Sequence, residues 1–476
     1  MSTEYRNFLA LPYEELETLN LAAKSDRLNR VPADEIREKR LKYLRDEKRI
    51  KAVTVLFSDL EGRLHLLDYD KKFLLDSYEN LTFDGSSIRG FTAQKESDLR
   101  LGIDWASFYW VPADVFGTGK VLVFGNVIDK DGTPYSGDLR GVLKAYSEKL
   151  FNEKQYTLNA ATEIEGFLFG GKDAEQVYHK TGNFELISTG GYYHSLPLDP
   201  LRQFIDTAAE VQRAMGFQNE KDHPEVAPSQ FEINFGYAEV VAAADQIQLY
   251  KLLCRQIANN MGYTTSFLPK PVVGVNGSGM HTNVSVSQGK TNLFWDEKGE
   301  EHLSKFGWEF LDRILTRALD LCLVFNSSVN AYRRLDPHFE APNQIRASAV
   351  DRGAMIRVPI GNHRSMRTEV RAVAPDANPY LVLYSIFKTG IDGDISTDPK
   401  LREGGHFLPD NIQTALEDFK SSKWIESILG ADVQGRYVDL KQAVANRSPR
   451  ELGGIVKGSE VQFHHSVYNQ SLWNQF

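Results

Sequence analysis

Cysteine is scarce in this chain: its 476 residues include only Cys254 and Cys322. Both lie in apolar stretches with helical spacing, so we expect them to be buried core residues. Two thiols placed in this way exclude a disulfide framework and a thiolate metal cluster.

Long hydrophobic runs and an excess of basic residues are also missing. No run reaches the roughly 18 apolar residues that a membrane-spanning helix needs, and the first residues contain no basic stretch followed by an apolar core. The net charge of -9 argues against nucleic acid as the main partner, because proteins that bind it usually present a basic surface. We therefore expect a cytoplasmic protein with neither a membrane nor a nucleic-acid partner.

The composition that remains is typical of a soluble globular protein, with 42% hydrophobic and 25% charged residues. The chain is too long for one ordinary core, and its patterning predicts an α+β fold in three parts. Residues 1–50 form a charged, helical extension, which is either a surface helix or an interaction arm. Residues 51–135 form a small β-rich domain. Residues 136–476 form a large domain in which helices and strands alternate, ending in a helical tail.

Four predicted strands carry polar side chains on a face where apolar ones are usual. In "VNGSGMHTNVSV", Met280, Thr282 and Val284 share one face and His281, Asn283 and Ser285 share the other. The same alternation places together Glu163 with Glu165, Gln230 with Glu232 and Asn234, and Arg367 with Glu369 and Arg371. One such strand would be a solvated edge, but four of them predict a sheet whose concave face is a polar cavity.

Carboxylates dominate this predicted cavity, together with one imidazole. The ligand-type residues are Glu163, Glu165, Glu225, Glu232, His281 and Glu369. Carboxylates this close would repel one another unless a cation neutralised them. Oxygen ligands with one imidazole suit Mg²⁺ or Mn²⁺, and six ligands suffice for two ions.

Arginines are the second group of residues expected in the predicted cavity. The stretches "NAYRRL", "DRGAMIRVP" and "HRSMRTEVR" supply Arg333, Arg334, Arg352, Arg357, Arg364, Arg367 and Arg371. Guanidinium groups bind phosphate and carboxylate oxygens in pairs, so divalent ions and arginines in one cavity suit phosphoryl transfer. The chain has no phosphate-binding loop of the G-x-x-x-x-G-K-[ST] type, so ATP would be held by metals and arginines.

Six motifs in a fixed order resemble the glutamine synthetases of the bacterial type I class. They are "FDGSSIRGF…ESDL", "TEIEGFLF", "HPEVAPSQFEI", "NGSGMHTNVS", "NAYRRL…FEAP" and "RTEVR…DANPYL", within about residues 51 to 400. The resemblance implies a small N-terminal β-grasp-like domain. It also implies a large C-terminal catalytic domain with a curved antiparallel sheet, of the glutamine synthetase and guanido kinase type.

The resemblance also implies roles for the residues of the cavity. One metal would be bound by Glu165, Glu225 and Glu232, and the other by Glu163, His281 and Glu369. Glutamate would be held by Arg334, Arg371, His223 and the backbone near Asn276 and Gly277. Asn283, Ser285, Arg352, Arg357 and Arg364 would lie on the nucleotide side, with Arg352 also acting in catalysis, and Glu340 would be a carboxylate that closes over the reacting centre.

The implied reaction joins ammonia to glutamate at the expense of ATP, through a γ-glutamyl phosphate. Asp84 and Ser87 would reach the site from a neighbouring subunit and form an ammonium pocket with Tyr192, Glu225 and Glu340. Asp84 would also act in catalysis, by taking a proton from the bound ammonium. An oligomer is therefore expected, as a dodecamer of two six-membered rings. Two alternatives stay open: a ligase that joins glutamate to an organic amine, and a non-catalytic structural or sensor relative.

Overall fold

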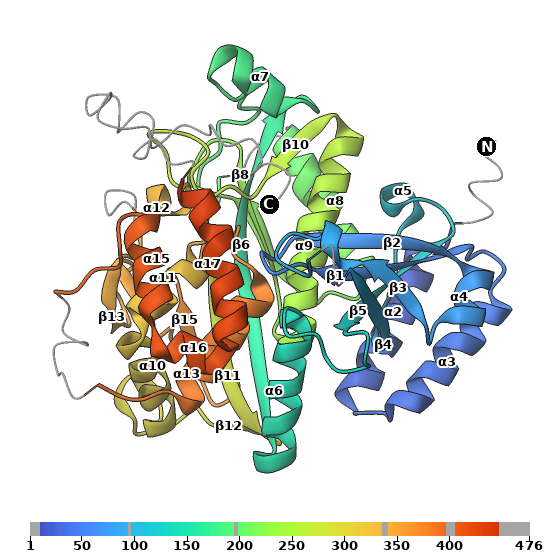
Figure 1. The fold of residues 1–476 in the computed structure, drawn as a ribbon. Helices are drawn as coiled ribbons and strands as arrows, with labels where there is room; N and C mark the ends of the chain where they lie inside the picture. The colour runs from blue at the N-terminus through green and yellow to red at the C-terminus, as the bar shows by residue number, and fades with distance from the viewer. Residues whose placement is uncertain (1–9, 94–96, 195–198, 336–340, 397–404, 447–476) are drawn as a thin grey trace.

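The computed structural model describes residues 10–93, 97–194, 199–335, 341–396 and 405–446. Two β-sheets organise this part of the chain, a smaller one near the N-terminus and a larger one in the remainder (Figure 1). The helical packing tail predicted at the C-terminal end lies outside the described residues.

Two helices precede the small sheet, α2 (Tyr13–Leu28) and α3 (Ala33–Asp46). Each starts directly after a proline, whose fixed φ and missing N–H suit the beginning of a helix. In α2 the buried Asn20 contacts both parts of the molecule, because its amide nitrogen donates to the carbonyls of Trp110 and Ala214, each at 2.8 Å. The charged N-terminal stretch is therefore helical and packed in its described part, while its boundary as a separate domain stays a prediction.

The small sheet has five strands in the order β2-β1-β5-β4-β3, and only the central β1–β5 pair is parallel. Its strands are β1 (Ala52–Ser58), β2 (Leu64–Asp70), β3 (Leu81–Asp84), β4 (Asp98–Trp110) and β5 (Lys120–Ile128), with α4 (Lys71–Ser77), η1 (Gly85–Ser87) and α5 (Ala113–Phe116) between them. Successive side chains alternate between two cores. Val53 and Val55 pack under α2 and α3, whereas Leu56 and Phe124 face the large domain.

The large sheet has ten strands and runs β13-β14-β15-β11-β6-β8-β7, with β9 and β10 on β6 and β12 on β11. The pairs along this path are antiparallel except β13–β14, which is parallel. The strands are β6 (Tyr156–Gly170), β7 (Asn219–Pro224), β8 (Gln230–Phe235), β9 (Ala238–Glu239), β10 (Tyr263–Ser266), β11 (Met280–Gln288), β12 (Thr291–Asn292), β13 (Gln344–Ser348), β14 (Ala354–Arg357) and β15 (Thr368–Val370). At fifteen residues, β6 is the longest strand and forms the spine of the sheet (Figure 1).

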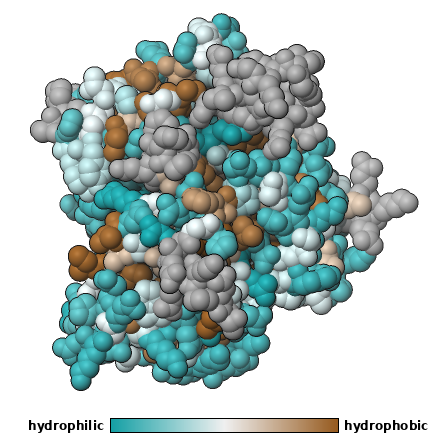
Figure 2. All heavy atoms as spheres, turned by 90° about the vertical axis from the view of Figure 1, so that its left-hand side faces the viewer, coloured by the Kyte–Doolittle hydropathy of each residue, from teal (hydrophilic) through white to brown (hydrophobic). Residues whose placement is uncertain are grey.

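The large domain contains many helices, some of which pack on the apolar face of this sheet. The helices are α6 (Leu139–Lys154), α7 (Ala174–Thr181), α8 (Pro200–Ala214), α9 (Val240–Met261), η3 (Glu300–His302), α10 (Lys305–Thr316), α11 (Ala318–Phe325), α12 (Ala331–Arg334), α13 (Pro379–Asp392), α15 (Ile412–Ser421), α16 (Lys423–Leu429) and α17 (Ala431–Ala445). The contacts of α6 and α9 with β6, and of α8 with β8, bury the apolar alternates of the polar strands. Figure 2 shows the side of the molecule that lies on the left in Figure 1, where hydrophilic side chains are interrupted by several hydrophobic patches.

Cys254 and Cys322 are both buried in the apolar core, as the sequence predicted. Burial raises the pKa of both thiols, that of Cys322 to about 12. Within the described residues, no helix has the length and apolar character needed to cross a membrane.

Candidate active site

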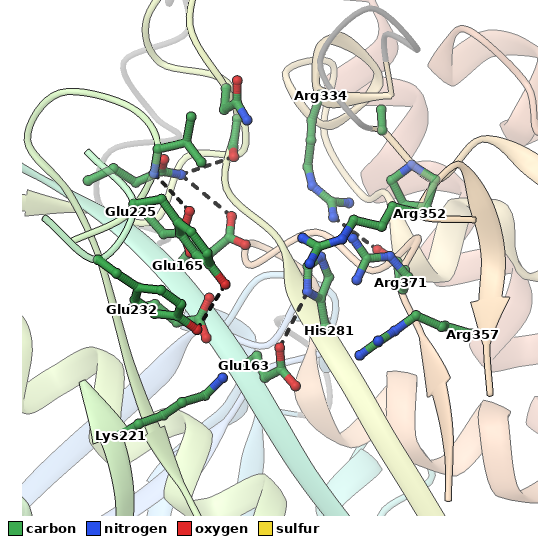
Figure 3. A pocket seen from close by; sticks show the side chains of 18 of the residues that line it. Glu163, Glu165, Lys221, Glu225, Glu232, His281, Arg334, Arg352, Arg357 and Arg371 are labelled. Atoms are coloured by element: carbon green, nitrogen blue, oxygen red, sulfur yellow. Dashed lines mark hydrogen bonds and ion pairs between the residues drawn. The ribbon is translucent and has the colours of Figure 1, made fainter. Parts of the chain in front are cut away.

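A cavity of about 570 Å³ opens on the polar face of the large sheet (Figure 3). Strands β6, β7, β8 and β11 supply its acidic side, and the segments around β14 and β15 supply arginines on the other side. The lining residues include Glu163, Glu165, Lys221, Glu225, Glu232, His281, Arg334, Arg352, Arg357, Arg367 and Arg371. The predicted polar cavity is therefore present.

Strand register brings the carboxylates together. Glu165 pairs directly with Glu232 of β8, and Glu163 pairs with His281 of β11. On the far side of β11, Asn283 pairs with Glu369 of β15. Because directly opposite residues have Cβ atoms about 5 Å apart, the register alone assembles the acidic strip.

One group of potential ligands consists of Glu163, His281 and Glu369. Nδ1 of His281 lies 3.8 Å from Oε2 of Glu163 and 3.7 Å from Oε1 of Glu369. These distances are too long for hydrogen bonds but suit ligand atoms that share a cation. Burial and the nearby Arg371 lower the pKa of His281, so its imidazole is neutral near pH 7, as a metal ligand must be.

A second group consists of His223, Glu225 and Glu232. The two ring nitrogens of His223 each lie 3.7 Å from a glutamate oxygen, Nδ1 from Glu225 and Nε2 from Glu232. The family resemblance implied that Glu165 would belong to this group and that His223 would bind the substrate. In the structure Glu165 lies beside the group and is held by the backbone N–H of Gly279 at 2.8 Å.

Two carboxylates of this region have a raised pKa in the absence of a cation. Burial and the charge of Glu225 raise the pKa of Glu165 to about 8. Burial, with the charge of Glu165 added to it, raises the pKa of Glu232 well above its usual value. Divalent cations would relieve this repulsion, so the donor set and its electrostatics fit two such ions.

Buried arginines face the acidic strip. The fully buried carboxylate of Glu369 accepts from Nε of Arg357 and from Nη1 of Arg371, both at 2.6 Å. Arg334 donates from Nη2 to the carbonyl of Arg371 at 2.9 Å. Nη1 of Arg334 and Nε of Arg371 are buried without a hydrogen-bond partner among the described residues. Both arginines line the cavity, where their guanidinium groups can bind an anion.

Glycine is required at the turn that leads into β11. A Cβ atom at Gly279 would lie 2.5 Å from Nη2 of Arg334 and 2.8 Å from Nε2 of His281. A Cβ atom at Gly277 would lie 2.5 Å from the carbonyl of Pro269. The "NGSGMH" turn thus lets the backbone approach both an arginine and a potential metal ligand, and Asn276 and Gly277 line the cavity.

Several predicted site residues lie elsewhere. Asn283 is adjacent to the cavity and holds two of its members, donating to Glu163 at 3.1 Å and accepting from Arg367 at 2.9 Å. Ser285 is half-buried further along β11, and Arg364 is exposed. Asp84 and Ser87 belong to the small domain and do not line this cavity. Glu340 lies outside the described residues.

The cavity also contains residues that the sequence did not assign to it. Tyr192 was predicted, but Tyr193 lies beside it, with the ring of Tyr193 edge-on to His223 at 4.6 Å between centroids. Lys221, which was not predicted, also lines the cavity, as does Arg367, which was predicted among its arginines. Lys221 precedes His223 by two residues, and this alternation was the signal that could have identified it.

Comparison with known proteins agrees with this architecture. The family model described as "Glutamine synthetase, beta-Grasp domain" matches residues 49–130, and "Glutamine synthetase, catalytic domain" matches residues 136–451. The fold and the cavity thus define a two-domain protein with a β-grasp domain and a catalytic domain of the glutamine synthetase type. The chain belongs to the glutamine synthetase family.

Individual relatives bear this out. The chain is 35% identical over 422 residues to a glutamine synthetase of Methanosarcina mazei, which covers 83% of this chain and 91% of that one. It is 34% identical over 417 residues to a glutamine synthetase of Staphylococcus epidermidis, covering 83% and 92%. A glutamine synthetase of Plasmodium falciparum solved by electron cryomicroscopy shares the fold, with a TM-score of 0.77 at 19% identity over 88% of this chain and 97% of that chain.

Proposed function

We propose that this protein ligates ammonia to L-glutamate, using ATP and producing L-glutamine, ADP and phosphate through a γ-glutamyl phosphate. The observation that carries the proposal is a single cavity in which two clusters, each of two carboxylates and one imidazole, face buried arginines. The chain that forms this cavity belongs to the glutamine synthetase family. Phosphoryl transfer depends mainly on positioning and charge neutralisation, which such a cavity supplies.

The cations of the proposal are Mg²⁺ or Mn²⁺. Glu163, His281 and Glu369 would hold one ion, and Glu165, Glu225 and Glu232 would hold the other, with His223 close enough to share it. The bound ions would neutralise negative charge on the transferred phosphoryl group. The buried, mutually repelling carboxylates support this assignment, since without a cation at least one of them must stay protonated near neutral pH.

Arg334 and Arg371 are assigned to the glutamate substrate. Their unpartnered buried N–H groups would each satisfy a substrate carboxylate oxygen, and His223 with the backbone at Asn276 and Gly277 would complete the subsite. Glu369 fixes the direction of Arg371 before the substrate binds. An arginine held in this way loses little entropy on binding, which favours a single orientation of glutamate.

Arg352, Arg357 and Arg364 are assigned to the nucleotide, with Asn283 and Ser285. Asn283 acts through Arg367. Its side-chain oxygen accepts a hydrogen bond from Nε of Arg367, which would direct this guanidinium group toward the phosphates. The side-chain carboxylate of glutamate attacks the γ-phosphorus of ATP, and ADP leaves. Arg352 then stays on the acyl phosphate as its charge redistributes. Closure by the segment containing Glu340 would keep water from hydrolysing this intermediate.

The proposal includes a neighbouring subunit. Asp84 is exposed in the small domain and is absent from the cavity of its own chain, which supports a role in the site of the next copy. There Asp84 and Ser87 would hold ammonium together with Tyr192, Glu225 and Glu340. Membership of the bacterial type I class, and with it a dodecamer of two hexameric rings, is part of the proposal. So is a cytoplasmic location, where ATP is available.

The decisive experiment compares ammonia with a panel of organic amines in a phosphate-release assay with ATP, glutamate and Mg²⁺. We expect glutamine to form from ammonia with the highest kcat/KM. A higher kcat/KM with a polyamine or another amine would instead identify a γ-glutamyl-amine ligase. If ATP and glutamate bind but no acceptor releases phosphate, the protein is a non-catalytic relative.

A further inference from the structure

Lys221 introduces a cation on the acidic side of the cavity. It lies in β7, at the end of the sheet opposite to β13, and its side chain points toward Glu163 (Figure 3). The arginines of the cavity come from the other side, Arg357 from β14 and Arg367 from just before β15. Lys221 is therefore positively charged where the surrounding strands contribute carboxylates.

The ammonium of Lys221 is free in the part of the chain that the structure describes. It forms no ion pair within 4.0 Å and no hydrogen bond there, although Glu163, Glu225 and Glu232 line the same cavity. The adjacent Asp222 is occupied by Arg202. By contrast, Arg357 and Arg371 are both bound to Glu369. The charge of Lys221 acts on Glu163 at longer range. Because no direct contact holds its ammonium among the described residues, the ammonium can bind a molecule in the cavity.

Strand register indicates which substrate the ammonium of Lys221 would contact. His223 pairs with Glu232, which pairs with Glu165, the glutamate that contacts the backbone of Gly279 on the substrate side. Two residues earlier in β7, Lys221 lies one step along the sheet in the direction of Glu163. Glu163 is connected through Asn283 to Arg367. Lys221 therefore lies at the level of the nucleotide-side groups rather than the glutamate-side groups.

We propose that Lys221 is a phosphate-binding residue that contacts the polyphosphate of the nucleotide from the side opposite to Arg357 and Arg367. This inference rests on the proposed function. A lysine ammonium is a mobile point charge that binds phosphate without needing paired geometry, so it suits a flexible polyphosphate. With the polyphosphate chain held from both sides, the γ-phosphoryl group at its end would be aligned for attack by the glutamate carboxylate.

The test measures ADP binding by calorimetry on the assembled protein with Mg²⁺, for Lys221→Met and Lys221→Arg. Methionine keeps most of the length of the side chain and removes its charge. We expect Lys221→Met to raise the Kd of ADP about 10- to 100-fold, because a hydrogen bond to a charged group is lost. The KM for glutamate should not change, and Lys221→Arg should restore most of the ADP affinity. The matched control is Lys305→Met. Lys305 lies in α10, away from the cavity, and its side chain is 91% exposed.

An unchanged Kd of ADP in an assembled Lys221→Met protein would overturn the inference. A change in Mn²⁺ affinity or in the KM for glutamate, with normal ADP binding, would overturn it as well. ADP binding can be measured without turnover. Failure of the phosphate-binding role of Lys221 can therefore be distinguished from failure of the proposed ligation reaction. Glutamine formation with ADP binding indifferent to Lys221 refutes only this inference. Lys221-dependent ADP binding without ligation refutes only the proposed reaction.

Discussion

The carboxylate of Glu369 lies 2.6 Å from Nη1 of Arg371, and the glutamate is fully buried. A potential metal ligand is thereby in direct contact with a potential glutamate-binding group. The same carboxylate accepts from Arg357 on the nucleotide side. Glu369 thus connects the potential binding sites for metal, glutamate and nucleotide through two short hydrogen bonds. A buried carboxylate between two guanidinium groups is also costly to remove, because the buried Arg371 and the half-buried Arg357 would both lose their counter-charge.

We predict that Glu369→Gln binds one Mn²⁺ fewer per subunit and loses about 100-fold or more in kcat. Glutamine preserves the shape of the side chain but has neither the charge nor the second acceptor oxygen for both arginines. The number of bound ions can be measured by equilibrium dialysis with Mn²⁺. The melting temperature should fall in the same variant, because Arg357 and Arg371 lose their shared partner.

The control for this prediction is Glu61→Gln. Glu61 is likewise buried and accepts from Lys441 at 2.9 Å, but it connects the small domain with α17 and does not line the cavity. Its substitution should lower the melting temperature while leaving the Mn²⁺ number unchanged. If Glu369→Gln bound the wild-type number of ions, Glu369 would be a structural ion-pair partner and not a metal ligand.

We predict that metal binding releases protons near pH 7. The pKa of Glu165 is about 8 in the folded, metal-free protein, so this group is mostly protonated at pH 7 and must lose its proton when a cation binds. Metal affinity should therefore increase with pH up to about 8. Calorimetric titrations of Mg²⁺ in two buffers with different ionisation enthalpies would measure the released protons directly. Glu165→Gln should reduce the release by about one proton per subunit.

The same pKa determines how Glu165 affects the stability of the metal-free protein. Its ordinary value is 4.5, so between that pH and about 8 the folded state binds more protons at this site than the unfolded state does. Stability from this group is therefore greatest at low pH and decreases as pH rises through this window. Added Mg²⁺ should restore the stability of the protein most strongly at the upper end of this pH range. Metal binding without proton release would show that Glu165 is already ionised.

Much of the cavity could be predicted from the sequence, because strand alternation places every second side chain on the same face. This rule identified Glu163, Glu165, His281 and Glu369 without knowledge of which strands are neighbours. The neighbours themselves depend on long-range pairing that local patterns do not determine, such as β11 with both β6 and β15. For this reason the sequence did not reveal that His223 stands between Glu225 and Glu232.

The N-terminal extension shows the other limit of sequence patterns. Its helical character was evident from spacing and charge, but the role of Asn20 was not. This polar residue is 4% exposed because it satisfies backbone groups of two distant segments, at Trp110 and Ala214. A buried asparagine has the same local signature as an exposed one. Its importance appears only once the small sheet and α8 are in place.

We predict that two inactive variants restore activity when their subunits are mixed. Asp84→Ala removes the contribution of the small domain, and Glu163→Gln damages the cavity itself. Random reassembly of equal amounts from the unfolded state would give about a quarter of the sites an intact Asp84 from one subunit and an intact Glu163 from the other. Affinity tags on each variant would verify that mixed oligomers form. Verified mixed oligomers that remain inactive would contradict a shared site.

The final prediction concerns the charge of Asp84. Its carboxylate accepts from the backbone N–H of Ser86 at 2.9 Å and from the hydroxyl groups of Ser86 and Ser87, each at 2.6 Å. These hydrogen bonds lower the pKa of Asp84, so the side chain is a weak base but a permanent negative charge. Holding an ammonium ion is therefore the role that its chemistry fits best.

Asp84→Asn separates this role from that of a turn cap. Asparagine still accepts from the N–H of Ser86, as it does at many helix starts, but it carries no charge. We expect glutamine formation from ammonia to fall about 100-fold or more, while γ-glutamyl hydroxamate formation from hydroxylamine, which is neutral near pH 7, falls much less. Measuring both products with the same assembled variant decides the matter. Equal losses with the two nucleophiles would mean that Asp84 acts by shaping the loop, because a loop defect affects every acceptor alike.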